Sequence, residues 1–195
     1  MLSRCPWCLA HPLLTDYHDR EWGVPRPDDN AQFEHLLYEI FQAGLSWLTI
    51  LKRREVFREV FAGFDPVLLA QWEAGRVEKL LQDRRLIRNR AKIEAVINNA
   101  RHFLEIRAEF GCFSTFISRY KPKKRLSYNF ESEIPVQTPE ATALSQELKR
   151  RGFKFVGPTI CYAHIQAVGL VNDHLTTCFR YKEVAEMQSK ENLNS

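Results

Sequence analysis

The chain has 195 residues, a formal net charge of +4 and a hydrophobic fraction of 45%. This length predicts a single domain, and the weakly basic balance permits a nucleic-acid partner without requiring one. No apolar run approaches the roughly 20 residues of a membrane span, and the first 12 residues lack the apolar stretch of a secretory signal. The five cysteines are an odd number without an export signal, which favours a reducing, cytoplasmic location over a disulfide framework.

Apolar residues recur with a helical period along most of the chain. Ser46 and Asp65 precede helical segments as N-caps, and Thr138-Pro139 starts a later one. No segment alternates with the two-residue period of a half-buried strand, so the sequence predicts an all-α fold. The expected helices span 33–41, 47–61, a segment starting at 66, 77–82, 93–104, 113–120, 139–152 and 158–169.

Two segments lack this helical period. Residues 121–137 contain two prolines and four basic residues, and a loop of this length is either a mobile surface insertion or a nucleic-acid contact. Residues 182–195 are polar and lack an apolar stripe, which predicts a frayed tail. The folded domain is therefore expected to span residues 1–181.

A basic turn is followed by a helix start between residues 149 and 159. Glycine and proline at the start of a helix leave backbone N–H groups free to bind an anion, and the flanking positive charges favour a phosphate. The segment is therefore a candidate grip on a nucleic-acid backbone. The residues concerned are Lys149, Arg150, Arg151, Gly152 and Lys154, followed by Gly157, Pro158 and Thr159.

His174 and Cys178 are spaced so that a helix would place two metal ligands on one face. A closed tetrahedral site needs two more, and the other region rich in such residues is the N-terminus, with Cys5, Cys8, His11 and His18. Spacing alone leaves Cys5 with Cys8 and Cys5 with His18 as rival pairs. A redox role for the Cys-x-x-Cys pair is disfavoured because no βαβ pattern surrounds it, and buried thiols that bind no metal are the other alternative.

Tyr17, Glu39 and Trp47 are separated in sequence, yet the turn 42–46 could bring them together over one pocket. A glutamate within an otherwise apolar helix stands out in this group. The alternative is that Glu39 lies on the solvent side of its helix, together with His35 and Gln42.

Taken together, six segments resemble the DNA-3-methyladenine glycosylase I family, which belongs to the helix-hairpin-helix glycosylase superfamily. The resemblance runs from about residue 4 to residue 181. The matching segments are RCPW (4–7), YHDREWGVP (17–25), FQAGLSW (41–47), LIRNRAKIEAVINNA (86–100), LKRRGFKFVGPTICY (148–162) and GLVNDHLTTCFRY (169–181).

The resemblance implies one structural zinc ion held by two residues from each end of the chain: Cys5, His18, His174 and Cys178. It implies a pocket for the damaged base formed by Tyr17, Trp47 and the catalytic Glu39. Leu14 and Ile40 depart from the commonest family pattern near that pocket. The hairpin would bind the DNA backbone, and its implied contact residues are Lys149, Arg151, Gly152, Lys154 and Gly157.

The activity implied is base-excision repair by a monofunctional enzyme, which flips 3-methyladenine out of double-stranded alkylated DNA and hydrolyses its N-glycosidic bond. A monomer is expected. Lys154 as a Schiff-base nucleophile is disfavoured, because the family is monofunctional. Asp173 follows the hairpin where related glycosylases carry a catalytic aspartate, but its position beside His174 suits a structural role equally well. The rival is a zinc-stabilised DNA-binding module that has lost catalysis.

Overall fold

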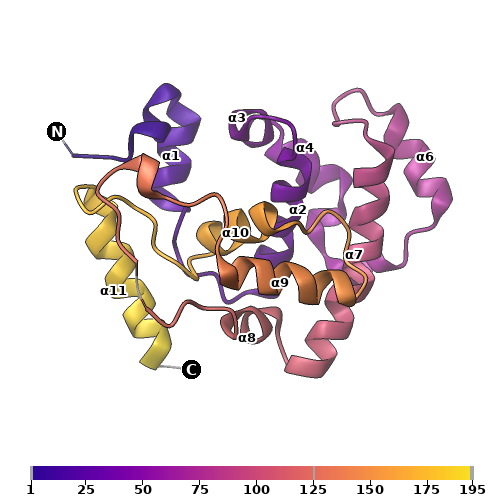
Figure 1. Cartoon of the computed structure of the whole chain (residues 1–195). Helices are drawn as coiled ribbons and strands as arrows, with labels where there is room; N and C mark the ends of the chain where they lie inside the picture. Colours follow the sequence, from indigo (N-terminus) through magenta and orange to yellow (C-terminus); the bar gives the residue numbers. More distant parts are fainter. Residues whose placement is uncertain (1, 125, 194–195) are drawn as a thin grey trace.

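The computed structural model describes residues 2–124 and 126–193, and this part of the chain is helical without a β-strand (Figure 1). The α-helices are α1 (Pro12–Arg20), α2 (Asp29–Gln42), α3 (Trp47–Leu51), α4 (Arg54–Val60), α5 (Pro66–Ala70), α6 (Ala74–Gln82), α7 (Arg90–Phe110), α8 (Phe113–Ser118), α9 (Pro139–Arg150), α10 (Pro158–Ala167) and α11 (Phe179–Leu193). Three short 3₁₀-helices are η1 (Pro6–Ala10), η2 (Ala62–Phe64) and η3 (Glu131–Glu133). The predicted all-α class is confirmed.

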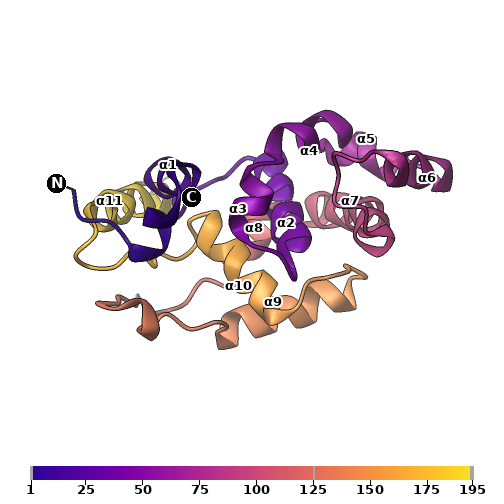
Figure 2. The ribbon, with the colours of Figure 1, turned by 90° about the horizontal axis from the view of Figure 1, so that it is seen from above.

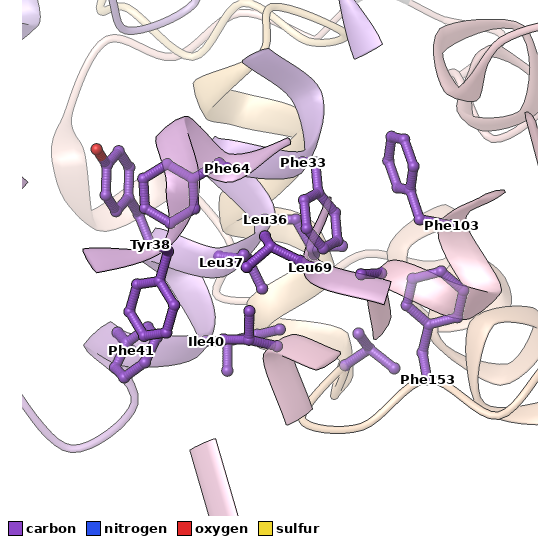
Figure 3. Close-up of a cluster of buried hydrophobic side chains, with 14 of the residues drawn as sticks. Phe33, Leu36, Leu37, Tyr38, Ile40, Phe41, Phe64, Leu69, Phe103 and Phe153 are labelled. Carbon is purple, nitrogen blue, oxygen red and sulfur yellow. The ribbon is translucent and has the colours of Figure 1, made fainter. Parts of the chain in front are cut away.

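Helix α2 runs through the centre of the main core and contacts α3, α7, α8 and α10. Its apolar side chains point toward Leu69 and Phe103 from other helices and toward Phe153 from the connection between α9 and α10 (Figure 3). Phe33 and Phe103, for example, have ring centroids 4.9 Å apart. Each such side chain removed from water contributes about 1.5–3 kcal/mol. None of the described helices combines the length and apolar character needed to cross a bilayer.

Local capping explains where several helices begin. The side chain of Ser46 accepts a hydrogen bond from the Thr49 amide, and Asp65 accepts from the amides of Val67 and Leu68. The Thr138 hydroxyl accepts from the amide of Ala141. The caps predicted at Ser46 and Asp65 and the helix start predicted at Thr138-Pro139 are confirmed. The single helix expected over 47–61 is instead divided into α3 and α4.

Helix α11 occupies the segment for which a frayed tail was predicted, and that prediction is wrong for residues 182–193. Val184 is fully buried, and the Gln188 side chain donates a hydrogen bond to the Gly169 carbonyl at 2.8 Å. The Phe179 amide donates a hydrogen bond to the Ser3 carbonyl at 2.9 Å, so the start of α11 lies against the N-terminal residues. Figures 1 and 2 place α1 and α11 together at one end of the molecule, with α6 at the other. A single buried valine is too weak a periodic signal to reveal such a helix from sequence.

The loop 121–137 is tied to both chain ends over part of its length. The Tyr128 carbonyl accepts a hydrogen bond from the Thr176 amide at 2.9 Å, and Glu131 accepts from the Trp7 amide at 2.7 Å. The part of the loop around Tyr128 and Glu131 therefore packs over the predicted metal ligands. This part is held by hydrogen bonds and is not the mobile insertion considered above.

Candidate active site and metal centre

Three helices bring Tyr17, Glu39 and Trp47 into one region. Tyr17 lies on α1, Glu39 is in the last turns of α2, and Trp47 opens α3. The rings of Tyr17 and Trp47 have centroids 5.0 Å apart and are inclined by 56°. Burial, and then the charge of Glu39, raise the pKa of Tyr17 well above its ordinary value, which places the carboxyl group close to that ring.

The Glu39 carboxyl group is buried, with the residue only 4% exposed. Its Oε2 atom has no hydrogen-bond partner among the described residues, and neither does the buried Nε1 of Trp47. Burial raises the pKa of Glu39 to about 8, so the neutral acid predominates near pH 7. The alternative placement of Glu39 and His35 on the solvent side of α2 is wrong, because His35 is also only 3% exposed.

The turn between α2 and α3 is fixed by a residue that sequence reasoning did not assign to the site. The Lys92 ammonium group donates to the carbonyls of Phe41 at 2.9 Å and Ala43 at 2.6 Å, which satisfies the end of α2. Gly44 follows with φ +81°, a conformation that favours glycine. The only sign of this role in the sequence was the position of Lys92 next to the apolar residues of α7.

Leu14 and Ile40, the two departures from the family pattern, face different surroundings. Leu14 packs in a small cluster with Cys8, Tyr17 and Leu51, so it supports the Tyr17 ring. Ile40 is fully buried in the main core around α2. Only the first of these two differences therefore lies beside the candidate base site.

The structure brings Cys5, His18, His174 and Cys178 together, with one ligand atom from each lying within 4.8 Å of all the others. The distance is 3.2 Å between His18 Nε2 and His174 Nδ1, and 3.5 Å between His18 Nε2 and Cys178 Sγ. The His174 Nδ1 atom lies 3.7 Å from Cys178 Sγ and 3.8 Å from Cys5 Sγ. All four residues are buried, and they form a candidate metal centre that joins the two chain ends.

The outer nitrogen of each histidine is also held. His18 Nδ1 lies 2.8 Å from the Asp19 carboxylate, and His174 Nε2 lies 3.0 Å from the Trp22 carbonyl. Such partners orient imidazole ligands and are typical of metal sites. The rival ligands are used elsewhere, since the Cys8 thiol donates to the Cys5 carbonyl and His11 caps α1.

The predicted hairpin connects α9 to α10 and is held by α7. The Asn99 side chain bonds both the amide and the carbonyl of Lys154, at 2.8 and 3.0 Å, and Asn98 donates to the Gly152 carbonyl at 2.8 Å. Gly152 has φ +96°, and a Cβ there would lie 2.5 Å from the His102 ring. The sequence analysis did not predict the role of either asparagine. Two neighbouring asparagines in a helix are only a weak sign that their side chains bind a distant backbone segment.

The hairpin side chains differ in their availability. Lys149 and Lys154 are exposed, and Gly157 caps α10. Arg151 instead pairs with Glu109 at 2.6 Å and Glu147 at 2.7 Å. Its guanidinium also lies over the rings of Phe110 and Phe116. These contacts give Arg151 a structural role, and its expected contact with phosphate stays a prediction.

Asp173 is buried and accepts hydrogen bonds from the Tyr162 hydroxyl and the Gln166 amide. These contacts join α10 to the segment that carries His174. They support the structural role considered for Asp173.

The chain belongs to the methyladenine glycosylase family, whose sequence profile matches residues 7–181. It is 46% identical over 183 residues to DNA-3-methyladenine glycosylase 1 of Escherichia coli, covering 92% of this chain and 97% of that protein. It is 43% identical over 180 residues to the DNA-3-methyladenine glycosylase of Haemophilus influenzae, covering 91% and 97%. A solved structure of 3-methyladenine DNA glycosylase I from Staphylococcus aureus, described as the basis of 3-methyladenine recognition, superposes with a TM-score of 0.87 at 37% identity, covering 92% of this chain and 97% of that one.

The raised pKa of Glu39 predicts a pH-dependent stability. Below about pH 4.5 the carboxyl is protonated in both the folded and unfolded states. Between about pH 4.5 and 8 only the unfolded state loses the proton, so this group lowers the free energy of unfolding by about 1.4 kcal/mol per pH unit. We expect Glu39→Gln to remove this term and to stabilise the fold most at pH 8, as measured by urea unfolding across pH 5–9.

Glu186→Gln is the matched control, because Glu186 is an exposed glutamate on α11. Wild-type and Glu39→Gln proteins whose stabilities differ by a constant amount at every pH would contradict the buried, neutral Glu39.

Proposed function

We propose that this protein is a monofunctional DNA-3-methyladenine glycosylase, which flips the damaged base out of double-stranded DNA and hydrolyses its N-glycosidic bond. The observation that carries the proposal is the buried Glu39 carboxyl group, which has an unpartnered oxygen and whose charge acts on Tyr17, a residue in ring contact with Trp47. Membership of the methyladenine glycosylase family and the names of the relatives support it. A protein that only bound DNA would have no use for such a group, which counts against the silent-module alternative.

The chemistry of the lesion suits these residues. Methylation at N3 gives adenine a positive charge and weakens its bond to the sugar, so the site needs selection and positioning more than a strong acid. Aromatic faces attract a desolvated cation by about 2 kcal/mol over a neutral ring. Glu39 ionises when this cation enters and then stabilises it, whereas unmodified adenine leaves the carboxyl neutral. Trp47, Tyr17 and Glu39 thereby all select the positive charge of the methylated base.

In this proposal, α9, α10 and the hairpin between them form the helix-hairpin-helix unit that binds DNA. Lys149 and Lys154 supply positive charge, and the backbone at Gly152 and Gly157 allows a phosphate to approach the start of α10. These contacts position the DNA without reading its sequence, which suits a repair enzyme whose substrate can occur in any sequence. We expect the enzyme to act as a monomer.

A zinc ion is the metal that fits the four ligands best. Tetrahedral zinc bound by two nitrogens at about 2.0–2.1 Å and two sulfurs at about 2.3 Å separates the nitrogens by about 3.3 Å and each nitrogen–sulfur pair by about 3.6 Å. The nitrogen–nitrogen distance of 3.2 Å and three of the nitrogen–sulfur distances, between 3.5 and 3.8 Å, agree with this arrangement, and all four ligand atoms lie within 4.8 Å of one another. Four protein ligands leave no position for a reactive water, so the ion would stabilise the fold and hold α1 against the C-terminal region.

Base release from N-methylated duplex DNA, resolved by chromatography, tests the activity. We expect the wild-type protein to release 3-methyladenine, and Trp47→Ala to lower the single-turnover rate about tenfold or more through the lost cation–π attraction. Phe130→Ala is the control, since Phe130 is 67% exposed on the loop 121–137. A folded, metal-replete wild-type protein that bound DNA but released no base would favour the alternative of a DNA-binding module that has lost catalysis.

Metal content tests the zinc site. We expect one zinc ion per chain in the wild-type protein by atomic absorption. Cys178→Ser should lose the metal and more than about 3 kcal/mol of stability, because the remaining ligands cannot close the site. Cys112→Ser, a change at a half-exposed cysteine that is not part of the cluster, should keep both. Full zinc retention in Cys178→Ser would refute the assignment.

The salt dependence of DNA binding tests the hairpin. Each phosphate contact contributes about one unit to the slope of log K against log salt concentration. We therefore expect Lys154→Gln to reduce this slope by about one unit. Lys182→Gln on α11 should leave it unchanged, and Arg151→Gln should mainly destabilise the protein. An unaltered slope in Lys154→Gln would contradict the proposed contact.

A further inference from the structure

A salt bridge joins the end of α1 to the start of α4. Two nitrogens of the Arg54 guanidinium each donate to a different oxygen of the Glu21 carboxylate, both at 2.6 Å. The two side chains are only 18% and 17% exposed. Among the described residues, no other hydrogen bond or ion pair links α1 and its C-cap to α3 or α4. The pair is therefore the polar link between the segments that carry Tyr17 and Trp47.

Glu21 lies one helical turn after Tyr17. Its amide caps α1 by donating to the Tyr17 carbonyl at 2.9 Å. Burial is the largest cause that raises the pKa of Tyr17, followed by the charge of Glu39. The charge of Glu21 also raises this pKa and that of Arg54 lowers it, so the ion pair lies close to the phenol group.

Arg54 reaches the second aromatic residue of the site through Tyr38. The guanidinium carbon of Arg54 lies 5.7 Å from the centroid of the Tyr38 ring. That ring in turn meets the Trp47 ring edge-on, with centroids 6.4 Å apart and planes inclined by 77°. Because the rings of Trp47 and Tyr17 are themselves in contact at 5.0 Å, these contacts form a closed circuit. Its members, in order, are Tyr17, Glu21, Arg54, Tyr38 and Trp47.

Stability alone does not explain this ion pair. Removing two charges from water is costly, and apolar residues of similar volume often replace a buried ion pair without loss of stability. The Nε atom of Arg54 is also buried without a partner in the described part of the chain, which adds to the cost. What a two-point guanidinium–carboxylate contact provides, and an apolar contact does not, is a defined distance and orientation.

We infer that the Glu21–Arg54 pair positions the two aromatic rings of the base site for the flipped base. This inference rests on the proposed function, and it adds two positioning residues that need not touch the base. A cation–π contact requires the cation to lie within about 6 Å of a ring centroid, so the rings must keep their places when the base enters. The pair holds α1 at a fixed distance from α4, and the contact of Arg54 with Tyr38 extends this restraint to Trp47.

Arg54→Lys in the full-length, metal-loaded protein tests the inference, because lysine keeps the charge but loses the two-point contact. We expect single-turnover release of 3-methyladenine to slow about tenfold or more, since a misplacement of about 1 Å can cost about a hundredfold. Affinity for a duplex with an abasic site, which offers no base, should stay within about twofold of the wild type. Arg85→Lys is the control, because Arg85 makes a similar two-point contact with Glu59 at an exposed position.

A double-mutant cycle separates a pair from two independent residues. If Glu21→Gln and Arg54→Met each break the same link, the double variant should release base no more slowly than the slower single variant. Glu21→Asp, which shortens the other arm of the pair, replaces Arg54→Lys if that variant does not fold.

Three results would overturn the inference while leaving the proposed function intact. The first is a wild-type rate of base release in both Arg54→Lys and Glu21→Asp. The second is an equal loss of rate and of abasic-site affinity, which would indicate a general structural role. The third is a double variant whose loss is the product of the two single losses. A wild-type protein that released no base would overturn the proposed function and this inference together.

Discussion

The burial of the Glu39 carboxyl group is the constraint around which the structure is arranged. A carboxyl group removed from water holds its proton to a much higher pH than usual, and here that places its pKa at about 8. The other face of the same helix is packed into the main core, so α2 cannot rotate to expose the group. Lys92 fixes the end of α2 by binding the carbonyls of Phe41 and Ala43. The folded protein therefore tolerates a buried group that lowers its stability, and the proposed function supplies the cation that would offset this cost.

Contacts between the two chain ends hold the helix that carries Tyr17. Tyr17 precedes His18, one of the four clustered ligands, and α1 is otherwise a short helix of nine residues. Helix α11 contacts Ser3, and Glu131 of the loop 121–137 contacts Trp7, so both pack over the same region. A site that depends on the position of Tyr17 therefore depends on contacts between residues more than 150 positions apart in sequence. Loss of those contacts would disturb the aromatic pair before it disturbed the main core.

Helical periodicity and capping chemistry predicted much of the fold, because both are local. The caps at Ser46 and Asp65 needed only the residues next to them. Helix α11 escaped prediction because a few long-range contacts, rather than an apolar stripe, hold it in place. The burial of Glu39 and the ion pairs of Arg151 also depend on residues distant in sequence, and a charged side chain gives no local sign of such partners. The roles of the site residues rested on family resemblance, which local patterns could not replace.

Helix α7 links the candidate base site to the hairpin. Lys92 holds the turn before Trp47, and Asn99 holds the backbone of Lys154. These residues are seven positions apart, which is about two turns or roughly 10 Å along one face of a rigid helix. A hairpin that binds the DNA backbone and a site that receives a flipped base must keep a fixed separation, because the nucleotide connecting them has a fixed length. Anchoring both elements to one helix, two turns apart, provides that separation without requiring either to contact the other.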